Sequence, residues 1–151
     1  MTALFNKLNL KQQQQIVVLN APLSFSDELK QLTGIDVLQD VQKVDAIEFC
    51  LCFAEQQQQL HPFIEAIVGK LDGDAVLWFA YPKKSSQNYQ SDISRDQGWQ
   101  PLGQAGFEGV RQVAIDEDWS ALRFRKAEYI QSLKRNPKWI MSAEGKTRAK
   151  K

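Results

Sequence analysis

The chain has 151 residues, of which 43% are hydrophobic, and this length and composition predict one domain with a substantial core. Its formal net charge is only +1, but residues 1–133 carry 12 Lys and Arg against 17 Asp and Glu, whereas residues 134–151 carry 7 against one. No segment reaches the roughly 20 apolar residues of a membrane span, and the N-terminus lacks the features of a secretory signal, so we expect a cytoplasmic protein with no membrane partner.

The first half of the chain predicts strands that alternate with helices. Residues 4–8 are compatible with a short helix, and the apolar, β-branched run at residues 16–19 predicts the first core strand. Ser24 and Asp27 have the spacing of a capping box, so we expect a helix to begin near Ser24 and to end at Gly34. This order of elements is typical of an α/β fold.

Two further strands and a helix should follow. A short strand is expected over residues 35–41 and a longer one over residues 44–54, where apolar and polar residues alternate. Apolar residues recur at helical spacing from Leu60 to Leu71, which predicts an amphipathic helix with Pro62 in its first turn. The strands on either side of this helix should be parallel, because they are joined by a helical crossover.

The strongest pattern is the run from Ala75 to Tyr81, where seven consecutive apolar or aromatic residues show no alternation. Such a run predicts a central strand that is buried on both faces. Pro82 lacks the N–H that a sheet ladder needs, so the strand should end there. Residues 83–106 form a long polar connection, for which we expect one or two short helices or a loop with a function.

The C-terminal third returns to strands. Residues 107–115 and 120–125 flank the short segment 116–119, and this arrangement predicts an antiparallel hairpin. A last helix is expected from about Lys126 to Arg135, where Asn-Pro then stops it.

Together these elements predict a three-layer, Rossmann-like α/β sandwich. Its sheet should be mostly parallel, with about five or six strands and a C-terminal antiparallel hairpin. We expect a single domain over residues 1–135 and a basic tail over residues 136–151. In the second arm of the hairpin, Leu122 and Phe124 should face the core, and Ala121, Arg123 and Arg125 should face away from it.

The first strand-to-helix turn does not predict a standard nucleotide site. Dinucleotide-binding folds carry G-x-G-x-x-G there, whereas residues 20–25 of this chain are Asn-Ala-Pro-Leu-Ser-Phe, without a glycine. A pyrophosphate could not approach this backbone in the usual way, which excludes a standard NAD or FAD site. We therefore predict no cofactor.

The loop directly after Pro82 is the best candidate for a ligand site, because ligands of open α/β sheets usually bind at the carboxyl ends of the strands. Two ammonium groups, two hydroxyls and exposed backbone N–H groups suit a phosphate or a carboxylate. The end of the first strand should reach the same edge if the two strands are neighbours. The predicted ligand-binding residues are Asn20, Tyr81, Lys83, Lys84, Ser85 and Ser86. The alternative is a loop that is only solvated surface.

Three arginines, Arg111, Arg123 and Arg125, lie on the predicted hairpin. They form either a second basic cluster or, as we favour, ordinary surface pairs with nearby acids. The acids that we expect as partners are Glu108, Asp116 and Glu128.

The other candidates for chemistry favour structural roles. The adjacent carboxylates at residues 116–118 have no further ligands at a metal-binding spacing, and His61, the single histidine, has no evident nucleophile beside it. Cys50 and Cys52 should be reduced, buried thiols, because a closed zinc site needs about four ligands. The glutamine run at residues 56–59 has the composition of a solvated edge. We predict no catalytic residue and no metal.

The basic tail mixes lysines and arginines with Trp139. Such a segment could clamp nucleic acid or dock on a protein partner. The alternative is disorder, which we expect beyond about residue 142.

Four short phrases of the sequence resemble a family of small bacterial cytosolic proteins known only as a domain of unknown function. The phrases are Asn20–Phe25, Val44–Ile47, Leu77–Lys83 and Asp116–Arg123, and the resemblance spans residues 16–125. It implies a compact α/β domain and no particular activity. The order of elements is also similar to an abbreviated sheet of the methyltransferase type, whose members bind their cofactor at a glycine-bearing first turn.

These observations favour a non-enzymatic domain that binds a small anion or a protein partner at residues 81–86. One alternative is an atypical, methyltransferase-like enzyme that binds a nucleotide. Another is nucleic-acid binding through the tail.

Overall fold

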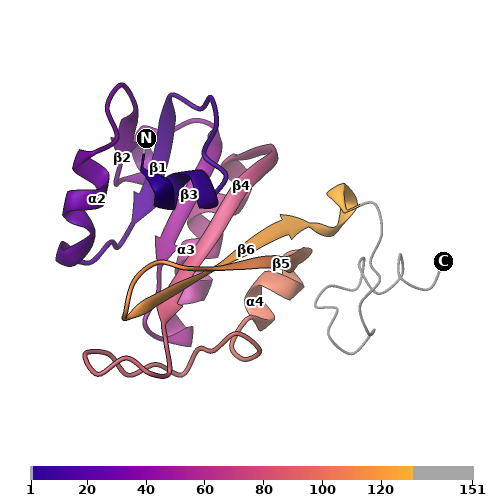
Figure 1. Cartoon of the computed structure of the whole chain (residues 1–151). Coiled ribbons are helices and arrows are strands. Elements are labelled where there is room, and N and C mark those ends of the chain that lie inside the picture. Colours follow the sequence, from indigo (N-terminus) through magenta and orange to yellow (C-terminus); the bar gives the residue numbers. More distant parts are fainter. Residues whose placement is uncertain (1, 131–151) are drawn as a thin grey trace.

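The computed structural model of the chain describes residues 2–130 and builds them around one six-stranded sheet (Figure 1). The strand order is β2-β1-β3-β4-β6-β5, and β6 is antiparallel to both of its neighbours while β1 to β4 are parallel. The strands are β1 (Gln15–Leu19), β2 (Asp36–Leu38), β3 (Ile47–Phe53), β4 (Leu71–Pro82), β5 (Phe107–Ala114) and β6 (Trp119–Lys126). The predicted mostly parallel sheet with a C-terminal hairpin is confirmed.

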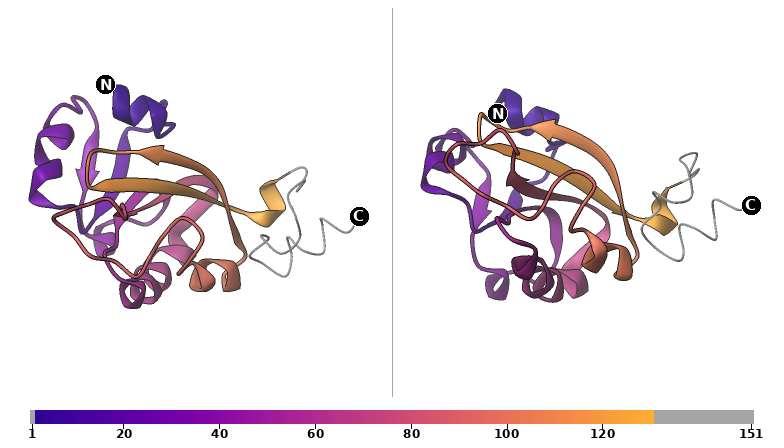
Figure 2. Two further views of the ribbon diagram at one scale, coloured as in Figure 1. Left: turned by 60° about the horizontal axis from the view of Figure 1, so that its bottom comes forward. Right: turned by 90° about the horizontal axis from the view of Figure 1, so that it is seen from below.

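Short helices cover both faces of the sheet. The α-helices are α1 (Ala3–Lys7), α2 (Ser26–Lys30), α3 (Leu60–Ile67) and α4 (Gln100–Gln104). Single turns of 3₁₀ helix are η1 (Leu23–Phe25), η2 (Val41–Lys43), η3 (Gln57–Gln59), η4 (Val68–Lys70) and η5 (Ala127–Tyr129). Figure 2 shows α1 on one face of the sheet and α3 with α4 on the other. Within residues 2–130, no helix is both long and apolar enough to cross a membrane.

The strand β4 lies between β3 and β6, and its alternate side chains enter two separate cores. Leu77, Phe79 and Tyr81 pack toward α3 and α4. Trp78 and Ala80 pack on the opposite side, toward α1. All five are buried, so the predicted central strand covered on both faces is confirmed.

The boundaries of several elements differ from the sequence predictions. The strand β4 already begins at Leu71, because Gly73 adopts a φ of +58° and lets the chain bulge instead of turning away. The helix expected from Ser24 begins as η1 after Pro22, and no side chain caps it. Only one turn, η5, follows β6, and residues 131–135 of the predicted last helix lie outside the described residues.

The prediction for the hairpin faces was half right. Leu122 and Phe124 do point into the core beneath α3 and α4. Ala121 was predicted to face away from the core and is instead fully buried in the second core. The prediction was wrong because it assumed a sheet with one wet face, whereas Trp78 and Trp119 cover this region.

Trp78 also fixes the N-terminal segment to the sheet. Its indole Nε1 donates a buried hydrogen bond to the carbonyl oxygen of Leu8 at 2.7 Å. The helix α1 has only five residues, too few to be stable in isolation, so tertiary contacts must hold it. Those contacts come from Phe5, whose ring packs against Phe25 and Phe49.

We expect Trp78→Phe to lower the free energy of unfolding by about 2 to 4 kcal/mol, because it removes buried ring volume and leaves the Leu8 carbonyl without a donor. Urea denaturation measures this change. The control is Leu23→Ala, since Leu23 is 88% exposed and its truncation should cost less than about 0.5 kcal/mol. A Trp78→Phe protein as stable as the control would contradict this role.

Candidate functional site

The chain leaves the sheet after Pro82 and reaches α4 through a long loop, residues 83–99. One end of this loop is bound to the tip of the β5–β6 hairpin. The Asp118 carbonyl accepts from the backbone N–H of Lys83 at 2.7 Å, and the Asp118 carboxylate accepts from Ser86 Oγ at 2.8 Å and from Asn88 Nδ2 at 3.1 Å. The Asp118 side chain therefore works as a structural clamp.

The other end of the loop is bound to the start of η3. The backbone N–H of Gln57 donates to Asp92 Oδ1 at 2.7 Å, and Gln57 Nε2 donates to the Asp92 carbonyl at 2.6 Å. Gln56 Nε2 adds a bond to the Gln90 carbonyl at 2.8 Å. The glutamine run 56–59, predicted as a solvated edge, is exposed or half-buried at the start of η3, and its amides also hold the long connection in place.

Trp99 anchors the end of the loop in the core. Its ring makes an edge contact with the ring of Tyr81 at a centroid distance of 5.5 Å and a tilted one with Phe124 at 4.9 Å. Its Nε1 donates to the Ser94 carbonyl at 2.8 Å. Loop and sheet are thus joined at the point where β4 ends.

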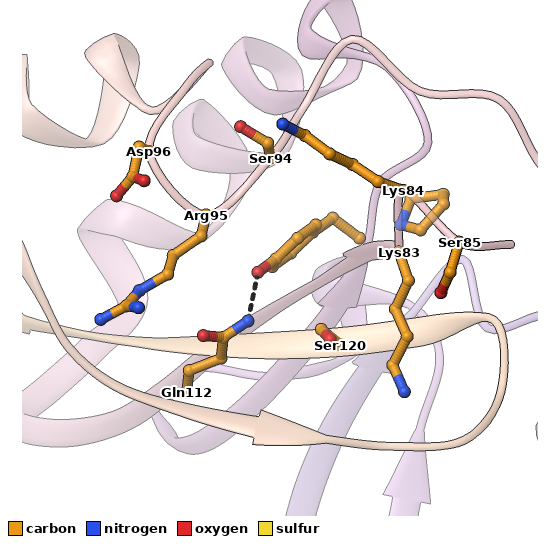
Figure 3. Close-up of a pocket in the computed structure, with 10 residues that line it drawn as sticks. Lys83, Lys84, Ser85, Ser94, Arg95, Asp96, Gln112 and Ser120 are labelled. Carbon is orange, nitrogen blue, oxygen red and sulfur yellow. Dashed lines mark hydrogen bonds between the residues drawn. The ribbon is translucent and has the colours of Figure 1, made fainter.

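A cavity of about 440 Å³ lies between this loop and the hairpin (Figure 3). It is lined by Tyr81, Pro82, Lys83, Lys84, Ser85, Ser94, Arg95, Asp96, Gln112 and Ser120. A volume of this size is in the range that holds a small metabolite.

Two largely buried residues present hydroxyl groups to the cavity. Tyr81 is 3% exposed and Ser120 is 6% exposed. Gln112 Nε2 donates to the Tyr81 hydroxyl at 2.8 Å, which leaves the tyrosine proton available to a further acceptor. The Ser120 hydroxyl makes no hydrogen bond within residues 2–130. Hydroxyls that face a cavity and have no acceptor in the protein can donate to a ligand that supplies one.

Burial raises the pKa of Tyr81, and the opposing effects of Arg95 and of the Gln112 hydrogen bond do not cancel this increase. The hydroxyl therefore keeps its proton at neutral pH and can donate it. Because the folded-state pKa is the higher one, this group contributes no pH dependence below its ordinary value near 10. Its favourable contribution to stability is lost as the pH rises above that value.

The rim of the cavity is basic. Lys83, Lys84 and Arg95 contribute three positive charges against the single carboxylate of Asp96. Figure 3 shows the ammonium group of Lys84 extending toward Ser94, whereas the Lys83 side chain points to the opposite side, over the hairpin. The two lysines therefore do not form a single clamp.

The structure brings together four of the six predicted site residues, Tyr81, Lys83, Lys84 and Ser85. Ser86 is not part of the lining, because its hydroxyl binds Asp118. Asn20 also lies outside it. Its Nδ2 donates to the Phe53 carbonyl at 2.9 Å and its φ is +59°, so this residue makes the turn after β1 and ties it to β3.

Sequence reasoning missed the half of the pocket that comes from other elements, namely Ser94, Arg95, Asp96, Gln112 and Ser120. Ser120 is a polar residue between Trp119 and Ala121 in a predicted strand, and this is a signal that could have marked it, whereas Gln112 follows Arg111 and carries no such signal.

The remaining candidates have structural partners. Asp116 Oδ1 accepts from the backbone N–H groups of Asp118 and Trp119 at 2.8 and 2.9 Å and so closes the hairpin turn. His61 is exposed beside Glu65 on α3. No group of three or more potential ligands that could hold a metal occurs within residues 2–130.

The two cysteines are free and buried, as predicted, with their sulfur atoms 3.6 Å apart. Burial raises the pKa of the Cys52 thiol, and the neighbouring Cys50 raises it further. The thiol therefore stays protonated at neutral pH and is a poor nucleophile.

The arrangement of strands and helices matches solved methyltransferase structures. A SAM-dependent methyltransferase from Aquifex aeolicus has a TM-score of 0.57 and 12% sequence identity, with 82% of this chain and 87% of that chain covered. The ribosomal protein L11 methylase from Lactobacillus delbrueckii subsp. bulgaricus has a TM-score of 0.51 and 11% identity, over 81% and 76%. TrmN from Thermus thermophilus has a TM-score of 0.51 and 10% identity, over 82% and 47%.

The chain thus has the α/β, Rossmann-like fold of methyltransferases, and at these identities the similarity concerns the fold alone. No protein-family model and no curated protein matches the sequence. The resemblance to a bacterial family of unknown function therefore stays a prediction.

The first turn of the sheet fits the cofactor of this fold poorly. The turn contains Ala21 and Pro22 in place of glycine, and the proline has no N–H to donate. Phe25 and Phe53 then pack ring against ring at 4.9 Å, and Phe53 contacts Trp119 at 5.1 Å. Aromatic rings therefore pack together at the carboxyl ends of β1 and β3.

We expect Gly98→Ala to lower the free energy of unfolding by about 1 to 3 kcal/mol and to speed proteolysis within residues 83–97. Gly98 has a φ of +104°, and an added Cβ would lie 2.9 Å from Cγ of Gln57, the residue that holds Asp92. Gly69→Ala is the matched control, because nothing lies within 4 Å of its Cβ position and its φ is not positive. Equal protease resistance of the two proteins would show that the clamp does not order the loop.

Proposed function

We propose that this chain is a binding domain that takes up a small oxyanion, a phosphate or carboxylate compound, in the cavity beside Tyr81. The observation that carries the proposal is the combination of the hydroxyl groups of two largely buried residues, Tyr81 and Ser120, with a rim of three cations and one carboxylate. The hydroxyls would donate to the oxyanion, and the net positive rim would attract it.

The two parts of the site would contribute differently. Lys84 and Arg95 are exposed, so salt screens their attraction for a ligand and each adds little alone. The hydroxyls line the cavity at the ends of largely buried side chains, and a hydrogen bond from one of them to a charged ligand is worth about 1.5 to 3 kcal/mol. The hydroxyls would therefore determine which ligand binds. No lining serine donates a hydrogen bond to a lining lysine or aspartate within residues 2–130, so no nucleophile there is held by a base, and we assign the cavity a binding role without a chemical step.

A second candidate function is nucleotide binding by a methyltransferase-like enzyme, which the similarity of fold favours. One residue of this chain supports it. Asp40 follows β2 at its carboxyl end, beside the end of β1, and Rossmann folds often place a ribose-binding acid there. Asp40 Oδ1 accepts from the backbone N–H of Gln42, and the second carboxylate oxygen makes no hydrogen bond within the described residues.

The two candidates place the ligand at different sites, so paired variants separate them. A thermal-shift titration would use inorganic phosphate and S-adenosylmethionine as probes, because a ligand at 100 times its dissociation constant adds about 2.7 kcal/mol of stability. We expect phosphate to stabilise the wild type. The double variant Lys84→Gln, Arg95→Gln and the single variant Ser120→Ala should each raise the dissociation constant for phosphate at least about tenfold. The thermal shift at a given phosphate concentration should therefore be smaller.

The matched control for charge is Lys7→Gln with Lys11→Gln, two exposed lysines in the segment that covers the opposite face. It should leave phosphate binding unchanged. A control variant that loses as much affinity as the pocket variants would reject the pocket. Stabilisation by S-adenosylmethionine that Asp40→Asn abolishes, together with no response to phosphate, would replace the first candidate by the second. Asparagine still caps η2, so this substitution tests the charge alone.

A further inference from the structure

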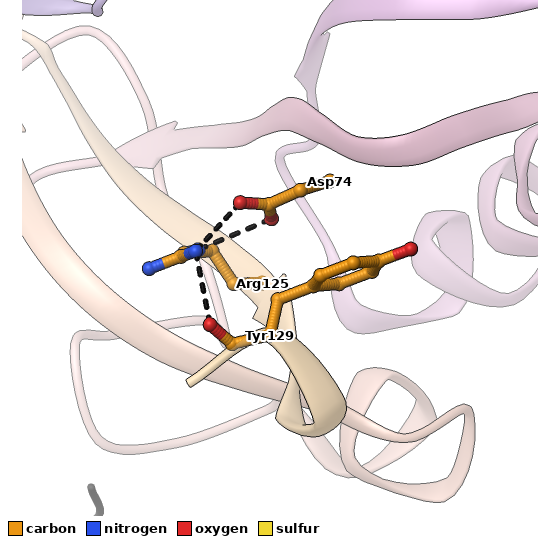
Figure 4. A network of polar contacts seen from close by, with 3 residues as sticks. All are labelled: Asp74, Arg125 and Tyr129. Carbon is orange, nitrogen blue, oxygen red and sulfur yellow. Dashed lines mark hydrogen bonds and ion pairs between the residues drawn. The ribbon is translucent and has the colours of Figure 1, made fainter. Parts of the chain in front are cut away.

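One arginine of the β5–β6 hairpin forms a complete ion pair. The Nε and Nη2 atoms of Arg125 donate to the two carboxylate oxygens of Asp74 at 3.1 and 2.6 Å, and Nη2 also donates to the Tyr129 carbonyl at 3.1 Å (Figure 4). The predicted partners of this arginine were other acids, so the prediction was right about pairing and wrong about the acid. The sequence could not identify Asp74, because the turn expected there is part of β4.

The other predicted basic groups have no such partner. Arg111 and Arg123 were expected to pair with acids in the same way, but they form no ion pair within residues 2–130. The predicted basic tail, residues 136–151, lies outside the described residues, so nucleic-acid binding through it stays a prediction.

The charged side chains at the rim of the cavity are also unpaired. They belong to Lys83, Lys84, Arg95 and Asp96. None of the four side chains makes a hydrogen bond or an ion pair within residues 2–130. Arg95 and Asp96 are consecutive in sequence and both are exposed. The cavity thus has charges of both signs, and each can still bind a partner from outside.

The segment that carries Arg95 and Asp96 is held in place. Ser94 and Gln97 exchange two backbone hydrogen bonds, at 3.1 and 3.3 Å, so the two charged residues between them form the tip of a tight turn. Nε1 of Trp99 donates to the carbonyls of Ser94 and Arg95, and this tryptophan is itself buried in the core. The backbone of the two charged residues is therefore fixed, while their side chains have no partner.

Both of these charges act on the same hydroxyl group of the cavity. Burial has the largest effect on the pKa of Tyr81 and raises it, whereas the charge of Arg95 lowers this pKa and the charge of Asp96 raises it. Figure 3 shows Lys84 and Asp96 along one side of the cavity and Gln112 along the other. A ligand that reaches the Tyr81 hydroxyl therefore meets a positive and a negative group together.

These charges place a condition on the ligand. An oxyanion alone would be attracted by the lysines and Arg95 but repelled by Asp96. A molecule that also carries an ammonium group would place that group at Asp96 and its oxyanion at the cations and hydroxyls. A cavity of about 440 Å³ has room for the organic body that joins two such groups, which an inorganic phosphate lacks.

We infer that the cavity binds a small metabolite that carries both an oxyanion and an ammonium group, as an amino acid or an amino-alcohol phosphate does. Asp96 would accept from the ammonium group, and the hydroxyls of Tyr81 and Ser120 would donate to the oxyanion. This inference rests on the proposed function, because it needs the same oxyanion site. It adds the second charge of the ligand and the residue that recognises it.

Isothermal titration calorimetry with the full chain tests the inference with two matched pairs of probes. The first pair is phosphoethanolamine and ethylene glycol phosphate, and the second pair is free aspartate and succinate. In each pair only the first compound has an ammonium group. We expect that compound to bind about two- to fivefold more tightly than its partner in one of the pairs, as an exposed ion pair would produce. The pair that shows the preference identifies the oxyanion as a phosphate or a carboxylate.

The variant Asp96→Asn should change the affinities of the two probes in opposite directions. It removes the partner of the ammonium group, so the ammonium-bearing probe should bind about two- to fivefold more weakly. It also removes a negative charge near the oxyanion, so the ammonium-free probe should bind more tightly. Asp96→Glu keeps the charge and should keep the preference for the ammonium group.

The matched control is Asp45→Asn, which makes the same chemical change far from the cavity. Asp45 is exposed, forms no ion pair within residues 2–130, and precedes β3 at the end of the sheet opposite to the carboxyl ends. This variant should leave the preference unchanged.

Equal affinity within both pairs, or a preference that Asp96→Asn leaves intact, overturns the inference, while binding of the ammonium-free probes still supports the proposed function. Loss of the preference in Asp45→Asn as well overturns it in the same way. If none of the four probes binds, the inference is wrong, and the thermal-shift response to inorganic phosphate then decides whether the proposed function is wrong too.

Discussion

The whole structure depends on the burial of β4 on both faces. A strand in the middle of a sheet must pair its backbone on two sides and cover its side chains on two sides, and residues 76–81 meet both demands. Pro82 then ends the strand, although its carbonyl side still pairs with Trp119. The chain therefore leaves the sheet at the carboxyl end of β4, where polar residues follow Pro82. The cavity forms at this point.

The fold is that of methyltransferases, but the polar site lies at a different strand from the first turn that such folds use. After β1 the chain has Ala21 and Pro22 in place of glycine, and the ring of Phe25 then packs against that of Phe53 at the end of β3. After β4 the opposite holds. There a long loop, held by Asp118 and Gln57, frames a cavity with polar side chains on every side. The charged groups of this chain thus lie at the end of β4, which is separated from β1 by β3 in the sheet.

Much of the fold could be predicted because local patterns determine it. Continuous apolar residues marked β4, and helical spacing marked α3. The sequence predictions were wrong where a contact with a residue far away in sequence determines burial. Ala121 looked exposed because an alternating strand usually has one wet face, and the cover provided by Trp78 cannot be seen from the hairpin itself. Distant contacts also decide which residues line the pocket. The residues that follow Tyr81 in sequence were predicted, whereas only folding brings Gln112 and Arg95 to the pocket. Asn20 was predicted to line it but does not, because its amide binds the Phe53 carbonyl.

The strand β6 carries different polar groups on its two faces through the simplest rule of strand geometry. Successive side chains alternate between faces, so Ser120 borders the cavity while Arg123, three positions on, points to the opposite face. As the strand antiparallel to both of its neighbours, β6 can be reached from β5 by a short turn, and that turn is closed by Asp116 and clamped by Asp118. The same acids that resemble a metal cluster in the sequence thus hold the hairpin rigid. A rigid hairpin can present different charges on its two faces, because the sheet between them keeps the groups apart and water screens each separately.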